Sequence, residues 1–188
     1  MNFSDLIKTR QSVRGYSDRP VEPEKLQMLI ESVRLAPSAS NSQPWKLIIV
    51  DDPALRDAVA RATFSSAISF NRFAPQAPVI AVLTVGKSKA ITQIGGWMKK
   101  REYLLIDIGI AAEHFCLQAA DLGLGTCMLG WFDETTIKKL LDIPRGIRVG
   151  LLITLGYPAE GYALRPKSRK ALEEMCAHNS YQHNSPRS

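Results

Sequence analysis

Cysteine is scarce in this sequence, and its placement excludes a zinc module. Cys116, Cys127 and Cys176 are widely spaced, with no CxxC pair and no nearby histidine at the spacing of a zinc site. We therefore expect buried free thiols and no bound metal.

Long apolar runs and targeting signals are also absent. No stretch of about 18 uncharged apolar residues occurs, so we expect no membrane-spanning segment and no membrane partner. The first residues, Met1–Asp5, lack the basic flank and apolar core of a secretory signal. The cytoplasm is therefore the expected compartment.

The common nucleotide-binding motifs are missing too. No GxGxxG follows a strand-like run and no GxxxxGK[ST] occurs, which argues against a dinucleotide-binding Rossmann fold and against a P-loop. A length of 188 residues fits one domain, large enough to bury roughly 70% of the surface of the unfolded chain. We expect this domain to span residues 1–177 and a polar tail to follow at 178–188.

Apolar periodicity and turn residues divide the chain into helices and strands. Amphipathic spacing predicts helices, and runs of β-branched apolar residues predict strands. Residues 64–77 fit neither pattern. Without an internal repeat, the irregular alternation indicates an α/β or α+β domain around one sheet. The expected helices are 2–9, 22–35, 53–63, 102–122 and 134–141, and the expected strands are 46–51, 79–85, 126–131 and 149–155.

The helix expected at 102–122 is apolar around most of its circumference, so it must be enclosed by protein. Asp107, His114 and Asp121 form a narrow polar line on it, because they are seven residues apart. We expect structural or interface roles for these three side chains. A small domain seldom wraps such a helix alone, so a second subunit is expected to complete its enclosure.

Positive charge is in excess. The formal net charge is +6 and the pI is near 9.3, which favours an anionic partner. Two clusters combine cations with a hydroxyl, Arg10–Arg14 near the start of the chain and Lys167–Lys170 near its end. In an extended segment, Arg10, Ser12 and Arg14 point to one side, as convergence on one phosphate requires. For each cluster taken alone, the alternative is a solvated group of charges.

The segment Pro37–Trp45 places hydroxyl and amide side chains between two prolines and ends on tryptophan. Proline restricts the backbone, and Ser and Asn side chains bond neighbouring backbone groups, so we expect a rigid polar loop. Such loops between regular elements are common binding sites. A plain helix-to-strand connection is the alternative.

Taken together and in this order, these segments resemble the nitroreductase family of flavin mononucleotide (FMN) enzymes nearly from end to end. The family's Arg-x-Ser-x-Arg/Lys motif is matched by Arg10, Ser12 and Arg14. Its Pro-Ser-x-x-Asn-x-Gln-Pro-Trp loop is matched within Pro37–Trp45, and its C-terminal Lys-Ser-Arg at 167–169. The joint match of short motifs is specific.

The resemblance extends to the middle of the chain. Asn71 corresponds to an asparagine that meets the flavin ring in that family. Met128, Leu129 and Gly130 fall where backbone amides approach the flavin N5 edge. Many relatives have Glu where Gly130 stands, so a backbone N–H rather than a carboxylate is expected to act there.

The resemblance implies a fold, a cofactor and a set of site residues. The fold would be α+β and nitroreductase-like, with three layers: a central, mostly antiparallel sheet flanked by helices, and a long buried core helix at the dimer interface. A homodimer would hold FMN at the subunit interface, with Ser38, Ser40 and Asn41 reaching the FMN of the neighbouring protomer. The implied FMN-binding residues are Arg10, Gln11, Ser12, Arg14, Pro37, Ser38, Ser40, Asn41, Gln43, Asn71, Met128, Leu129, Gly130, Lys167 and Arg169.

The implied activity is that of an FMN-dependent oxidoreductase. NADH or NADPH would reduce FMN and leave, and a nitroaromatic, quinone or flavin acceptor would then take the electrons in ping-pong order. No side chain is expected to act as a general acid. Trp97 and Met98 would form a lid over the flavin or pack in the ordinary way.

Three alternatives remain open at this point. The first is a flavin-binding sensor or regulatory protein without turnover, since a cofactor site does not guarantee catalysis. The second is a related activity such as reductive dehalogenation. The third is a nucleic-acid module, which we do not expect, because the cations are not interleaved with aromatic residues on one surface.

Overall fold

The computed structural model describes residues 1–86 and 103–181. Trp97 and Met98, the candidate lid, lie outside the described residues, as do residues 182–188 of the expected tail. The elements in chain order are α1 (Phe3–Thr9), α2 (Pro23–Arg34), η1 (Ala39–Asn41), β1 (Trp45–Val50), α3 (Pro53–Arg61), η2 (Ala74–Gln76), β2 (Val79–Val85), α5 (Tyr103–Asp121), β3 (Gly125–Leu129), α6 (Glu134–Leu140), β4 (Arg148–Gly156) and α7 (Leu172–Met175).

A four-stranded sheet forms the centre of the molecule, in the order β1-β2-β4-β3. Every neighbouring pair of these strands is antiparallel. β2 pairs on both sides and is buried along its whole length, which accounts for its continuous apolar run. β1 and β3 are the edges.

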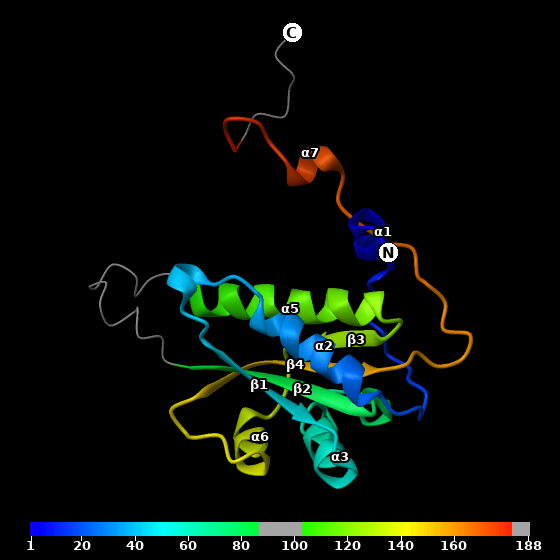
Figure 1. Cartoon of the computed structure of the whole chain (residues 1–188), viewed down its shortest axis with the longest axis vertical. Coiled ribbons are helices and arrows are strands. Elements are labelled where there is room, and N and C mark those ends of the chain that lie inside the picture. The colour runs from blue at the N-terminus through cyan, green and yellow to red at the C-terminus, as the bar shows by residue number, and fades with distance from the viewer. Residues whose placement is uncertain (87–102, 182–188) are drawn as a thin grey trace.

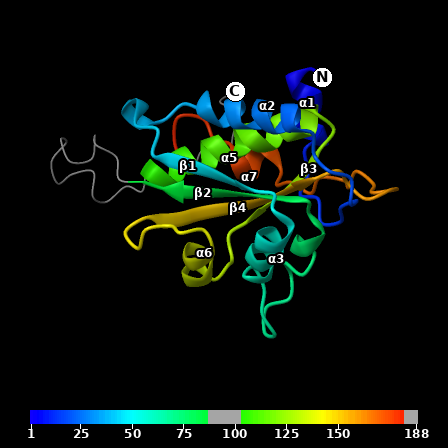
Figure 2. The same ribbon diagram turned by 60° about the horizontal axis from the view of Figure 1, so that its bottom comes forward.

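Helices cover both faces of the sheet and so make three layers (Figure 1). α2 and α5 lie on one face, while α3 and α6 lie on the other, as the turned view in Figure 2 also shows. Each interface has its own hydrophobic core, centred on Phe115 and Leu29 on the α5 side and on Val59 and Ile137 on the α3 side. The expected antiparallel sheet flanked by helices is confirmed.

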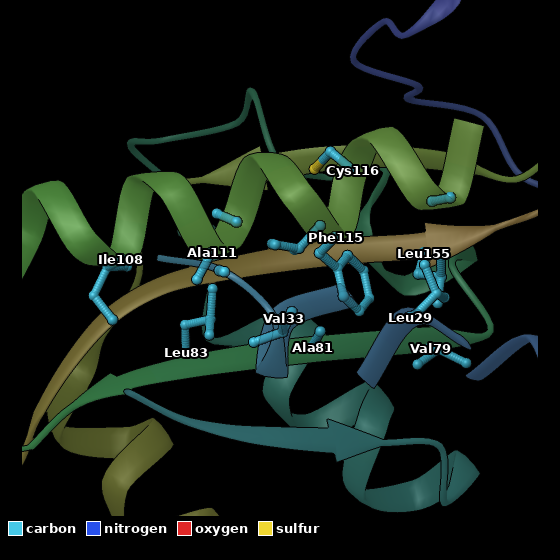
Figure 3. Packing of buried hydrophobic residues seen from close by; sticks show 14 of the residues in the cluster. Leu29, Val33, Val79, Ala81, Leu83, Ile108, Ala111, Phe115, Cys116 and Leu155 are labelled. Atoms are coloured by element: carbon cyan, nitrogen blue, oxygen red, sulfur yellow. The ribbon is translucent and has the colours of Figure 1, made fainter. Parts of the chain in front are cut away.

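α5 is the long apolar helix that the sequence predicts, and it packs against both α2 and the sheet (Figure 3). Phe115 is fully buried and lies among Leu29, Val33 and Ala81. Replacing such a side chain by alanine costs about 3–5 kcal/mol of stability. By length and composition alone, α5 is also the one helix among the described residues that could cross a membrane. Its place in the core explains its apolar character.

The segment that follows α1 runs beside the sheet. Ser12 forms a parallel bridge with Thr126 of β3, and Tyr16 forms an antiparallel bridge with Pro158 after β4. The Tyr16 hydroxyl lies 2.7 Å from the hydroxyl of Thr154 in β4. The beginning of the chain is thereby fixed next to the segment that leaves the last strand.

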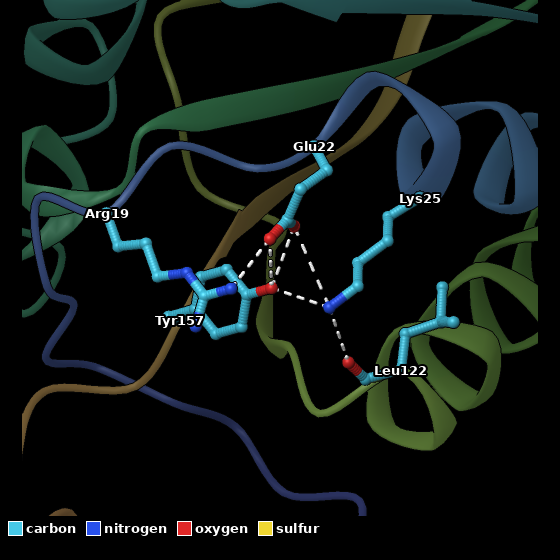
Figure 4. Close-up of polar contacts among 5 residues, drawn as sticks. All are labelled: Arg19, Glu22, Lys25, Leu122 and Tyr157. Atoms are coloured by element: carbon cyan, nitrogen blue, oxygen red, sulfur yellow. Dashed lines mark hydrogen bonds and ion pairs between the residues drawn. The ribbon is translucent and has the colours of Figure 1, made fainter.

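A polar cluster, called the latch below, reinforces this junction (Figure 4). Glu22 accepts hydrogen bonds from the Tyr157 hydroxyl at 2.7 and 2.9 Å and from Arg19 at 2.7 Å. Lys25 Nζ donates to the Leu122 carbonyl at 3.3 Å and lies 2.5 Å from the Tyr157 hydroxyl. The Arg19 guanidinium also stacks 3.9 Å from the centroid of the Tyr157 ring. Each charge of the latch has a partner within the latch.

One of the three thiols departs from the expectation of burial. Cys116 and Cys127 are buried, but Cys176 is exposed. Cys176 directly follows α7, in a segment that stands apart from the helical layers (Figure 1). The prediction was wrong because cysteine composition says nothing about which segments join the core. The domain boundary at residue 177 stays a prediction.

Candidate functional site

The two basic clusters, which lie at opposite ends of the chain, surround one pocket of about 300 Å³. Its walls come from the segment after α1 and from residues 163–169, which we call the strap. The lining residues of this basic pocket are Arg10, Gln11, Ser12, Arg14, Arg165, Pro166, Lys167, Ser168 and Arg169.

The N-terminal wall of the basic pocket is fixed by β3. Val13 is 3% exposed, and its backbone N–H donates to the Thr126 carbonyl at 2.8 Å. Gly125 permits this close approach, because a Cβ at that position would lie 2.6 Å from Cγ2 of Val13. With Val13 turned inward, alternation along the chain leaves Ser12 and Arg14 free to line the pocket.

The strap is held against this wall chiefly by Gln11. Gln11 Nε2 donates to the Ala163 carbonyl at 3.2 Å. Gln11 Oε1 accepts from the backbone N–H of Arg165 at 3.1 Å and from its Nε at 3.4 Å. A terminal nitrogen of Arg165 donates to the Ser12 carbonyl. These bonds join parts of the chain that are 152 to 154 residues apart.

Positive charge in the basic pocket is almost uncompensated. Glu113 of α5 lies 3.4 Å from Arg10 Nε, and among the described residues it is the only carboxylate that forms an ion pair with a pocket cation. Lys167 donates to the Arg10 carbonyl. Partial burial, together with the charges of Arg10 and Arg169, lowers the pKa of Lys167. A bound anion would relieve this crowding of like charges.

Two thiols lie behind the N-terminal wall and stay protonated. Burial raises the pKa of Cys116 to about 12. Burial also raises the pKa of Cys127, although the charge of Arg14 opposes the shift. Because nucleophilic cysteine chemistry needs the thiolate, neither thiol offers a reactive group to the pocket.

β3 leads from the basic pocket to the residues for which the family resemblance implies a place beside a flavin ring. It pairs with Ser12 near its start and ends at Leu129. Leu129 is 3% exposed, whereas Met128 is partly buried and Gly130 is exposed. Met, Leu and Gly carry no ionisable or nucleophilic side chain, so a polar contact to a ligand here would have to come from the backbone.

Asn71 lies beside the chain that leaves β3. It is 5% exposed, and its Nδ2 donates to the Thr63 carbonyl at 3.0 Å and to the Trp131 carbonyl at 3.3 Å. Its two amide hydrogens are therefore engaged in holding these segments together. Its Oδ1 has no partner within the described part of the chain and is the atom left for a ligand.

The loop Pro37–Trp45 is anchored on α5 by a buried carboxylate. Asp107 is 3% exposed, and its Oδ1 accepts a hydrogen bond from the backbone N–H of Ala39 at 3.0 Å. Its Oδ2 accepts from the Ser42 hydroxyl at 3.5 Å. The structural role expected for Asp107 is thus to hold this loop.

Backbone strain inside the loop fits the expectation of rigidity. Ser40, Asn41 and Gln43 have φ values of 53°, 53° and 45°, in the left-handed region that such residues rarely adopt. Ser38 Oγ accepts from the Gln43 N–H at 2.9 Å, and Gln43 Nε2 donates to Asn41 Oδ1 at 3.0 Å. Strained backbone that its neighbours hold in place is frequent at binding sites.

Within one chain, this loop and the basic pocket lie apart. η1 lies beside the beginning of α5, while α1 and the segment after it lie beside its end (Figure 1). The structure thus brings Arg10, Ser12 and Arg14 together with Lys167 and Arg169. It does not bring the loop of the same chain to them.

Arg165 is the charged pocket residue that motif matching missed; Pro166 also lines the pocket and lies outside the motifs. This arginine belongs to no short motif, but Arg165, Lys167 and Arg169 alternate along a segment without helix or strand. In an extended chain such alternation places side chains on one side. The repeat of a cation at every second position is the signal from which a pocket role for Arg165 could have been predicted.

The other members of the polar line on α5 make structural contacts. His114 Nδ1 lies 3.2 Å from the Ser32 carbonyl in α2. Asp121 pairs with the ammonium group of Met1 at 3.2 Å. These contacts join α5 to α2 and to the N-terminus.

Similarity to known proteins shows the family to which this chain belongs. The model of the Nitroreductase family matches residues 7–157. The chain belongs to the nitroreductase family. The family assignment made from the motifs is therefore confirmed, and so is the expectation of a nitroreductase-like enzyme.

Individual nitroreductase relatives are similar over most of their length. A protein of Archaeoglobus fulgidus, named as a candidate NADH dehydrogenase/NAD(P)H nitroreductase, is 31% identical over 159 residues, which cover 82% of this chain and 84% of that relative. The FMN reductase (NAD(P)H) of Bacillus subtilis is 27% identical over 180 residues, covering 88% and 70% of the two chains. The solved structure of an FMN-dependent nitroreductase from Clostridium difficile superimposes with a TM-score of 0.75 at 26% identity and covers 93% of this chain and 98% of that chain. The nitroreductase-like fold is thereby confirmed.

Proposed function

We propose that this protein is an FMN-dependent NAD(P)H oxidoreductase whose basic pocket holds the FMN phosphate. The observation that carries the proposal is a convergence of cations from both ends of the chain with one carboxylate to balance them among the described residues. A phosphate monoester carries about −1.5 to −2 charges at pH 7. Arginine forks and a serine hydroxyl bind its oxygens with directional hydrogen bonds.

The residues present fit this group in charge and in position. Arg14 and Arg169 are exposed, whereas Arg10 and Lys167 are half-buried in the lining of the pocket. Desolvation and like charges lower the pKa of Lys167, and a neighbouring phosphate would favour its charged form again. Phosphate binding therefore stabilises a cluster that is unfavourable by itself.

The flavin ring is proposed to lie along the line from the pocket to the end of β3. When bound, FMN supplies the exchange of hydride at N5. The backbone N–H groups of Met128–Gly130 would orient its N5 edge, and Asn71 Oδ1 would accept a hydrogen bond at the ring. The chain binds and orients the reactants, and no side chain needs to move a proton.

The proposed co-substrate and acceptors follow from the family. NADH or NADPH would reduce the enzyme, and a nitroaromatic, quinone or flavin acceptor would reoxidise it in ping-pong order. The names of the similar proteins support NAD(P)H, FMN and nitro compounds as the classes to test first. Because NAD(P)H is an intracellular reductant, we also propose a cytoplasmic location.

A homodimer is proposed because one chain leaves its site unfinished. Ile106 on α5 is 57% exposed, so the apolar helix keeps an outward face. The loop with Ser38, Ser40 and Asn41 presents polar groups far from the basic pocket of its own chain. In a symmetric dimer the loop of one subunit would complete the FMN site of the other.

The decisive experiment is direct. The purified protein is expected to be yellow and to release FMN on denaturation, and NADH or NADPH should bleach it under anaerobic conditions. No bound flavin after incubation with FMN would refute the proposal. Flavin that neither nicotinamide reduces would favour the sensor alternative, and a monomer that holds FMN at full affinity would refute the shared site.

A further inference from the structure

The side chain of Gln11 is already occupied by the strap. Its Oε1 accepts two hydrogen bonds from Arg165, and its Nε2 donates one to Ala163. A glutamine amide offers one oxygen with two lone pairs and two N–H groups. Gln11 therefore has its oxygen saturated and keeps one N–H, so its bonding is directed at the strap rather than at a ligand.

The strap has little else to hold it. Residues 163–169 contain neither helix nor strand, and all of them except Lys167 are exposed. Within the described residues, hydrogen bonds from the strap to the body reach Gln11 and the carbonyls of Ser12 and Arg10. Few buried contacts and solvent-exposed hydrogen bonds make a segment locally unstable.

The guanidinium group of Arg165 also bonds the strap to the N-terminal wall of the pocket. Its Nε donates to Gln11 at 3.4 Å, and a terminal nitrogen donates to the Ser12 carbonyl. Lys167 and Arg169, two and four residues further along, line the same pocket. Besides the bond from Lys167 to the Arg10 carbonyl, the position of these two cations thus depends on where Gln11 and Arg165 hold the chain.

We propose that Gln11 and Arg165 form a clasp that positions Lys167 and Arg169 over the phosphate end of the flavin. Gln11 is then a positioning residue and not the direct cofactor ligand that the sequence predicts. The inference rests on the proposed function, because it takes the ligand of the pocket to be FMN. It adds that the clasp and a bound phosphate stabilise the same position of the strap.

The test compares FMN with riboflavin, which has the same ring and no phosphate. In Gln11→Ala, the Kd for FMN is expected to rise about tenfold or more, the scale of one charge-assisted hydrogen bond, while the Kd for riboflavin stays unchanged. The measurement is quenching of flavin fluorescence on titration. Gln27→Ala, on the exposed side of α2, is the matched control and should bind both flavins like the wild type.

Two further readouts separate a clasp from a general loss of structure. Trypsin should cut the strap after Lys167 or Arg169 faster in Gln11→Ala, and FMN should protect it less than in the wild type. In a double-mutant cycle, the variant with both Gln11→Ala and Arg165→Ala should lose no more FMN affinity than the stronger single variant, because the two residues act as a unit.

The outcomes are distinguishable. If the wild type fails to bind FMN, the proposed function is wrong. If the wild type binds FMN but Gln11→Ala has the same FMN affinity and the same rate of tryptic cleavage, the clasp is wrong. Equal weakening of FMN and riboflavin, or additive effects in the cycle, would also overturn it.

Discussion

The latch and the basic pocket both join the N-terminal segment to the chain that follows β4, but they differ in how many of their cations pair with a carboxylate. In the latch, Arg19 and Lys25 share the carboxylate of Glu22. In the basic pocket, Glu113 is the one carboxylate paired with any of the clustered cations among the described residues. Cations that each pair with a carboxylate of the chain stabilise the fold alone, whereas unpaired cations gain their stability from a bound anion. This contrast distinguishes a structural cluster from the proposed binding site.

The largest effect is expected when the two half-buried cations of the pocket are removed. In Arg10→Ala/Lys167→Ala, the Kd for FMN should rise about a thousandfold, because each charge-assisted hydrogen bond contributes about 1.5–3 kcal/mol. Flavin-free stability in urea should not fall, since like charges are removed. The exposed Lys8→Ala is the control. A large loss of flavin-free stability would show that the pocket is structural, as the latch is.

Salt should affect the two regions unequally. Raising ionic strength to about 0.5 M should weaken FMN binding roughly tenfold, because mobile ions screen the exposed part of the cationic cluster. Riboflavin binding and flavin-free unfolding should change little. A calorimetric titration at several salt concentrations checks this, and an FMN affinity that is independent of salt would count against a phosphate in the pocket.

Breaking the latch should have the reverse consequence. Tyr157→Phe removes a hydroxyl that donates to Glu22 and contacts Lys25, and should lower the free energy of unfolding by about 1–2 kcal/mol. FMN affinity should stay at the wild-type value. Tyr181→Phe, at a side chain that is 98% exposed, is the control. Weaker FMN binding in Tyr157→Phe would show that the two regions are coupled.

The smallest effect is a dependence on pH. The pKa of Glu22 is lowered from 4.5 to about 2, first by the Tyr157 hydroxyl, then by its own backbone N–H and by Arg19. Because the folded-state pKa is the lower one, the stabilisation is complete above pH 4.5 and is lost as the pH falls towards 2. The difference in urea midpoint between wild type and Glu22→Gln should therefore shrink across that range. A constant difference would contradict the assignment.

The sequence predicted the regular elements well, because their signals are local. The strand expected at 79–85 is Val79–Val85, and the helix expected at 22–35 is Pro23–Arg34. The conformation of residues 64–77 could not be predicted from the spacing of apolar residues, because partners distant in the sequence determine it. Asn71, for example, bonds the Trp131 carbonyl, which lies 60 residues further along.

The residues of the proposed site were predictable to the extent that they belong to motifs. Arg10, Ser12 and Lys167 were identified in this way, and the structure brings them to one pocket. The clasp was not predictable, because the partner of Gln11 is Arg165, 154 residues away. Whether a polar side chain faces a ligand or another part of the protein depends on tertiary structure, which neither motif nor composition records.

The strap has a consequence for how the protein is made. Residues 10–14 leave the ribosome early, but the pocket lacks its second wall until residue 169 has emerged. Domains fold while synthesis proceeds at about 5–20 residues per second, so the sheet and its helices can assemble seconds before the cofactor has a place to bind. Flavin loading would then be the last step of biogenesis. Nascent chains stalled before the strap would be folded and colourless.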